Sequence, residues 1–103
     1  MTRAEPHASQ ERGSVGPVLE AGETAVAIVA AIRALNANVT VLDRGSYVRV
    51  LVPGRCVVTT EAIERALGRP FRLPRDLELV MPSFKGTLSM SEDEVVWAWR
   101  SAP

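Results

Sequence analysis

Hydrophobic residues recur along the first half of the chain with two different periods. Residues 24–35 carry five alanines and apolar residues at helical spacing, which predicts an α-helix. Arg33 is the only charge inside this segment, so its apolar surface is wider than that of an ordinary surface helix. From residue 38 the period changes to two on either side of the turn residues 43–46, which predicts a β-hairpin.

Shorter apolar segments flank the helix and the hairpin. Residues 14–19 are apolar but contain Gly16 and Pro17. Because proline cannot donate to a central sheet ladder, we expect an edge strand or an extended arm there. After the turn at residues 53–54, residues 56–58 predict another strand, which we expect to extend the sheet of the hairpin.

The second half of the chain predicts a helix and then three strands. The helix covers residues 60–67, with Thr60 as a favourable N-cap and Gly68 where helices end in a left-handed residue. The strands have more irregular sequences. They are expected at residues 77–81, 87–90 and 95–100, with a bulge or hairpin loop at residues 82–86 between the first two.

The expected order of elements is therefore strand, helix, three strands, helix, three strands. Short turns between successive strands favour antiparallel pairing, and two main helices over such sheets give an α+β fold without βαβ alternation. Residues 1–13 lack an apolar run, so we expect a disordered N-terminal tail there. Residues 14–103 are expected to form a single domain.

Composition narrows the classes of function. Of the 103 residues 47% are hydrophobic, and twelve basic side chains balance twelve acidic ones. With a net charge of zero, a general affinity for nucleic acid or for a membrane surface is not expected. The longest apolar run, residues 25–32, is far shorter than the roughly 20 residues of a membrane span. The single cysteine, Cys56, excludes an intrachain disulfide and favours a cytoplasmic location.

Few residues suggest chemistry. His7 is the only histidine and lies in the expected tail, so neither a metal site nor a catalytic triad is indicated. Cys56 stands on an apolar strand, as a buried and unreactive thiol would. Trp97 and Trp99 are two residues apart and therefore share one face of the expected strand. They serve either to close the core or to anchor an interface. We therefore expect a binding protein without catalytic residues or a cofactor.

Two ordered strings in the chain, however, are informative. Residues 41–50, VLDRGSYVRV, followed by residues 61–71, EAIERALGRPF, resemble the effector (coupling) proteins of bacterial multicomponent diiron monooxygenases. Residues 15–23 and the string MPSFKG at 81–86 extend the resemblance to nearly the whole domain, and the toluene 4-monooxygenase type is the closest. The short N-terminal segment departs from the methane monooxygenase type, which favours an aromatic substrate.

The resemblance implies a fold with two antiparallel sheets and a regulatory role without catalytic activity. Such a subunit binds the diiron hydroxylase component near its active site and shifts the helices there. It thereby improves the coupling of electron and O2 use to aromatic hydroxylation. The resemblance also implies that a Rieske ferredoxin competes for the same docking surface.

The docking residues that the resemblance implies are Met81, Pro82, Ser83, Phe84 and Lys85. Phe84 is the best candidate anchor because it is apolar among polar and small neighbours, although burial in the protein's own core remains open. Two other functions also remain open. The first is a small-molecule sensor with an apolar pocket between the helix at residues 24–35 and the sheet. The second is an enzyme whose fold brings together Asp43, Glu61 and Asp76.

Overall fold

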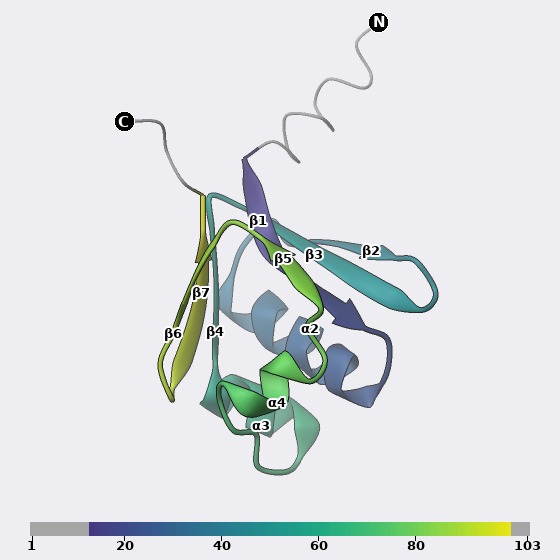
Figure 1. Ribbon diagram of the computed structural model, residues 1–103, viewed down its shortest axis with the longest axis vertical. Helices are drawn as coiled ribbons and strands as arrows, with labels where there is room; N and C mark the ends of the chain where they lie inside the picture. Colours follow the sequence, from purple (N-terminus) through teal and green to yellow (C-terminus); the bar gives the residue numbers. More distant parts are fainter. Residues whose placement is uncertain (1–12, 100–103) are drawn as a thin grey trace, which may run out of the picture.

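A computed structural model describes residues 13–99 and shows an α+β fold (Figure 1). Its elements are β1 (Ser14–Glu20), α2 (Glu23–Leu35), β2 (Thr40–Asp43), β3 (Tyr47–Pro53), β4 (Arg55–Thr59), α3 (Thr60–Leu67), α4 (Arg75–Glu78), β5 (Ser83–Lys85), β6 (Thr87–Met90) and β7 (Glu94–Ala98). This confirms the expected α+β class and the order of its main elements, with the short helix α4 added. The expected tail, apart from Gly13, lies outside the described residues.

The first sheet is antiparallel, with the strand order β2-β3-β1-β5. The expectation of an edge strand at residues 14–19 is wrong, because β1 lies between β3 and β5. Gly16 allows β1 to lie close to the backbone of β3. Its φ is +147°, and a Cβ there would lie 2.3 Å from the carbonyl oxygen of Val50. Pro17 is paired with Phe84 of the short strand β5, where a missing N–H removes little from the ladder.

The second sheet has the strand order β4-β7-β6 and is also antiparallel. The expectation that residues 56–58 extend the sheet of the hairpin is therefore wrong. Gly54, at φ +77°, redirects the chain after β3, and its carbonyl accepts a hydrogen bond from the N–H of Trp99. The two sheets consequently diverge from this corner, as Figure 1 shows.

The core lies between α2 and the two sheets. Val15 and Leu19 of β1, with Val50 and Val52 of β3, belong to the same buried cluster as the inner face of α2. Trp97 closes the cluster from the second sheet, whereas Trp99 lies beyond the end of β7 and is partly exposed. The two tryptophans thus separate into a core residue and a surface residue.

The expectation of a strand at residues 77–81 is wrong, because the first two of these residues belong to α4. Leu77 is completely buried, and its carbonyl accepts the N–H groups of Val80 and Met81. Asp76 supports the start of α4 by accepting the N–H of Arg72 at 2.8 Å. An apolar run this short has no periodicity that separates a strand from a buried helical turn.

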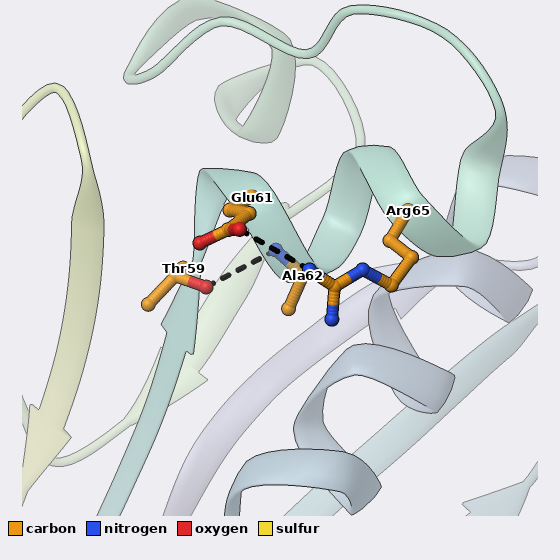
Figure 2. A network of polar contacts seen from close by, with 4 residues as sticks. All are labelled: Thr59, Glu61, Ala62 and Arg65. Carbon is orange, nitrogen blue, oxygen red and sulfur yellow. Dashed lines mark hydrogen bonds and ion pairs between the residues drawn. The ribbon is translucent and has the colours of Figure 1, made fainter.

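The second long helix, α3, covers the predicted residues, but its N-cap differs by one position. Thr59 has an extended backbone, and its hydroxyl accepts the N–H of Ala62 at 3.1 Å (Figure 2). Thr60 is already helical and donates its hydroxyl to the carbonyl of Glu92 at 2.9 Å, which connects α3 to the turn between β6 and β7. The ion pair between Glu61 and Arg65, also drawn in Figure 2, is exposed and contributes at most a few tenths of a kcal/mol.

Candidate docking surface

The docking residues predicted from the sequence lie around β5, at an edge of the first sheet. The expectation of a bulge or loop at residues 82–86 is wrong, since residues 83–85 form a strand that pairs with β1. The N–H of Glu20 donates to the carbonyl of Val80 at 2.8 Å and holds the approach to this strand. Gly86 then allows the turn into β6, where a Cβ would meet Val15 at 2.7 Å.

The five predicted residues do not share one environment. Met81 is only 9% exposed and belongs to the core cluster. Pro82, Ser83 and Phe84 are exposed, and Lys85 is half-buried. The side chain of Phe84 is 41% exposed, so it is neither a core residue nor fully solvated. Met81 therefore supports the segment from the core, and the other four residues are at least partly exposed.

Strand register separates these residues between the two faces of the sheet. Val18 of β1 is opposite Arg49 of β3 on one side and Ser83 of β5 on the other, so these three share the outer face. Phe84 is paired with Pro17, which is buried on the face that packs on α2. Since neighbouring residues of a strand alternate, Phe84 and Ser83 emerge from opposite faces at the same edge.

A groove of about 380 Å³ crosses the outer face of the first sheet. It is lined by Val18, Tyr47, Arg49, Pro82, Ser83, Phe84 and Lys85. It thus joins most of the predicted segment to the hairpin strand β3. Tyr47, 42% exposed, adds a second partly exposed aromatic residue to the groove.

Tyr47 and Arg49 were not among the predicted site residues, although they belong to a string that carried the resemblance. A usable signal was present in the period of β3. Val50 and Val52 belong to the buried cluster, and Tyr47 and Arg49 alternate with the valines of this strand. Residues of that second set must face away from α2 and toward the outer surface.

A second hollow, of about 270 Å³, lies between α2 and the hairpin, where the sequence analysis placed an alternative ligand pocket. It is lined by Ala21, Gly22, Ala25, Val26, Val29, Val41, Asp43, Gly45 and Val48. Its only charged group, the carboxylate of Asp43, accepts the N–H of Gly45 at 2.9 Å. The hollow is therefore an apolar surface with one carboxylate already engaged in the turn.

The groups considered for catalysis are engaged separately. Asp43 bonds within the hairpin turn, Glu61 pairs with Arg65 on α3, and Asp76 bonds to the start of α4. Among residues 13–99, no three His, Cys, Asp or Glu side chains are grouped so that they could hold a metal ion. Burial raises the pKa of the Cys56 thiol to about 12, which keeps it protonated and unreactive. His7 lies outside the described residues.

Comparison with known proteins identifies the family of this chain. The model of the MmoB/DmpM family matches residues 13–98. The chain belongs to the MmoB/DmpM family. A 44% identical relative is the effector subunit of the alkene monooxygenase system of Xanthobacter autotrophicus strain Py2, with the match covering 84% of this chain and 87% of that protein. This MmoB/DmpM chain is thus an effector subunit of a multicomponent monooxygenase.

Solved structures show the same MmoB/DmpM fold. Chains from two structures of a phenol hydroxylase–regulatory protein complex match with TM-scores of 0.74 and 0.71, at 17% and 19% identity. Each match covers 84% of this chain, and 98% or 99% of the other chain. At this level of identity the likeness establishes the fold. Within residues 13–99, none of the helices of this MmoB/DmpM chain has the length and hydropathy of a membrane span.

Proposed function

We propose that this effector subunit binds the diiron hydroxylase of its monooxygenase near the active site. There it shifts the hydroxylase helices and improves the coupling of electron and O2 use to hydroxylation, without catalysing a reaction itself. The observation that carries this proposal is the partly exposed Phe84 on an edge strand beside a groove, in a chain of the MmoB/DmpM family. Edge strands and partly exposed aromatic residues are both common elements of protein interfaces.

The proposed contact surface consists of Pro82, Ser83, Phe84 and Lys85, with Met81 holding the segment from the core. Truncation of an aromatic anchor at an interface typically costs about 2 kcal/mol or more of binding free energy. Because the ring of Phe84 is partly buried in the free chain, its orientation is restricted before binding. Less conformational entropy is therefore lost when the partner covers it.

Three finer features belong to the same proposal. A Rieske ferredoxin uses the same hydroxylase docking surface and competes with this subunit. The substrate is a small hydrocarbon: the sequence favours an aromatic one such as toluene, and the 44% identical relative belongs to an alkene monooxygenase system. The complex works in the cytoplasm, where the unpaired Cys56 would stay reduced.

The test is a titration of the cognate hydroxylase with wild-type protein and with Phe84→Ala, measuring substrate turnover and the electrons used per product. Both toluene and a short alkene should be supplied. We expect the half-saturating concentration to rise about 30-fold for the variant, as a loss of about 2 kcal/mol requires. Leu79→Ala is the matched control, because Leu79 is 69% exposed and does not line the groove.

Unfolding of the same variants separates binding from stability. Complete burial would make Phe84→Ala cost about 3–5 kcal/mol, and an exposed fraction of 41% reduces the expected cost to about 2 kcal/mol. A domain with a stability of about 5–15 kcal/mol stays folded after such a loss. An unchanged titration would remove Phe84 from the docking surface. If wild-type protein altered neither turnover nor coupling, the proposed function would be wrong.

The hollow between α2 and the hairpin favours a second candidate function, that of a small-molecule sensor. Its apolar lining suits a hydrocarbon ligand. Native mass spectrometry of the protein with toluene or the alkene distinguishes the two functions. Retained ligand, together with no effect on the hydroxylase, would support the sensor instead of the docking subunit.

A further inference from the structure

Arg49 lies in the middle of the outer face of the first sheet. Its strand register places it opposite Leu42 of β2 on one side and opposite Val18 of β1 on the other. Ser83 of β5 extends the same row across β1, so the row crosses all four strands of the sheet that Figure 1 shows. The guanidinium thus belongs to a side chain that rises from a rigid, paired strand at the groove.

The Nε atom of Arg49 is buried, and none of the described residues gives it a hydrogen-bond partner. Two exposed arginines, by contrast, have carboxylate partners: Arg65 pairs with Glu61 at 3.1 Å, and Arg69 with Glu23 at 3.3 Å. Arginine stays charged at all ordinary pH values. A buried charged donor without a partner costs free energy that folding of the free chain does not recover.

The two charged residues that line the groove are both basic. Arg49 and Lys85 line it, and none of its lining residues carries a carboxylate. The closest carboxylate in register on the same face is Glu20, which is opposite Tyr47, and no ion pair joins it to Arg49. The whole chain, by contrast, has a net charge of zero. The positive charge that Arg49 brings to the groove is therefore a local feature rather than part of a generally basic surface.

We propose that a carboxylate side chain of the hydroxylase, from an aspartate or a glutamate, enters this groove and pairs with the guanidinium of Arg49. The inference rests on the proposed function and specifies the recognition chemistry of its docking surface. Two N–H groups of a planar guanidinium form a fork that matches the two oxygens of a carboxylate. Tyr47 emerges on the same face as Arg49 and lines the same groove, so it would shield the pair from water.

Shielding determines how much such a pair contributes. An exposed ion pair contributes little because water and salt screen it, whereas truncation of one member of a desolvated interfacial pair weakens binding by a factor of about 30 or more. The Nε of Arg49 is already desolvated in the free chain, so part of the desolvation cost is not incurred again on binding. The pair is therefore expected to affect affinity and to fix the orientation of the docked subunit.

The test compares the binding of Arg49→Gln, Arg49→Lys and Arg33→Gln to the cognate hydroxylase by calorimetric titration. Arg33→Gln is the matched control, since it removes the same charge from the exposed side of α2. We expect Arg49→Gln to weaken binding about 30-fold or more and Arg33→Gln to change it less than about threefold. Arg49→Lys keeps the charge without the fork and should recover only part of the affinity.

The outcomes separate the two proposals. Binding of Arg49→Gln within about threefold of wild type would overturn the carboxylate pairing and leave the docking function intact. Equal losses for Arg49→Gln and Arg33→Gln would also overturn it, because the effect would then come from net charge. If Arg49→Gln did not fold, Arg49→Lys would decide: full wild-type affinity would refute the need for the fork. Absence of wild-type binding would reject the proposed function together with the pairing.

Discussion

Asn36 connects the end of α2 to the edge strand β4 of the second sheet, and its replacement tests how this helix and sheet are held together. Its side-chain amide donates to the carbonyl groups of Ile32 and Val57, both at 2.8 Å. Its side-chain oxygen accepts the N–H of Val57 at 3.0 Å. Because β4 is the edge strand of its sheet, no neighbouring strand of that sheet takes these two backbone groups of Val57. The substitution Asn36→Ala removes all three hydrogen bonds.

The expected loss follows from these bonds. A net hydrogen bond contributes about 1 kcal/mol, and removal of one partner costs up to about 1.5 kcal/mol where it leaves a partly buried backbone group unpaired. The two bonds to Val57 should therefore make Asn36→Ala less stable by about 2–3 kcal/mol. For a domain of about 100 residues this lowers the thermal midpoint by roughly 10–20 °C. The bond to Ile32 adds little, because the backbone N–H of Asn36 also donates to that carbonyl at 3.0 Å.

Urea unfolding, followed by circular dichroism, measures the loss directly. The control is Asn38→Gly in the same loop: Asn38 has a φ of +58°, which glycine adopts without strain. We expect this control to stay within about 0.5 kcal/mol of wild type. A loss below about 0.5 kcal/mol for Asn36→Ala would show that its side chain does not hold β4, and the reasoning would be refuted.

Two further predictions concern the core. Gly16→Ala should prevent folding or lower the thermal midpoint by well over 10 °C, because its Cβ would lie 2.3 Å from the oxygen of Val50; a midpoint near that of wild type would contradict the close approach. The Cys56 thiol, whose pKa burial raises from 9.0 to about 12, stays protonated in the folded state while it ionises in the unfolded state above pH 9. The stability contributed by the protonated thiol is therefore complete below pH 9. It is lost between pH 9 and 12, by up to about 1.4 kcal/mol per pH unit. The unfolding free energy of Cys56→Ala should lack this pH dependence.

The elements with a strong local pattern were predictable from the sequence. Helical spacing and the change to period two identified α2 and the hairpin, since these patterns reflect which residues face the core. The left-handed residue at Gly68, with a φ of +82°, ends α3 as expected. The N-cap was misplaced by one position because two adjacent threonines, Thr59 and Thr60, are equally suitable by residue type.

The errors concern contacts between distant parts of the chain. Pro17 indicated an edge strand, but the short strand that pairs with it there comes from residues 83–85, which no local pattern connects to β1. The strand at residues 55–59 leaves the first sheet because its pairing with β7 depends on a segment 40 residues later. Local propensity does not contain this information, and tertiary packing decides it.

The candidate site also combines a local feature that the sequence predicts with contacts between distant segments that it does not. The sequence located the segment around Phe84 by resemblance, but it could not separate the buried Met81 from the exposed Phe84. The groove needed three strands brought together, and Arg49 becomes part of it only through the pairing of β3 with β1.

The stability of the folded chain does not by itself explain an arginine at position 49. An arginine with a buried, unpaired Nε is a cost to the folded chain, and a leucine or threonine on the outer face would avoid it. The contribution of strand β3 to the core already comes from the neighbouring valines, Val50 and Val52. A residue that costs stability in the isolated subunit and lines a groove therefore supports the proposal that Arg49 serves binding rather than folding.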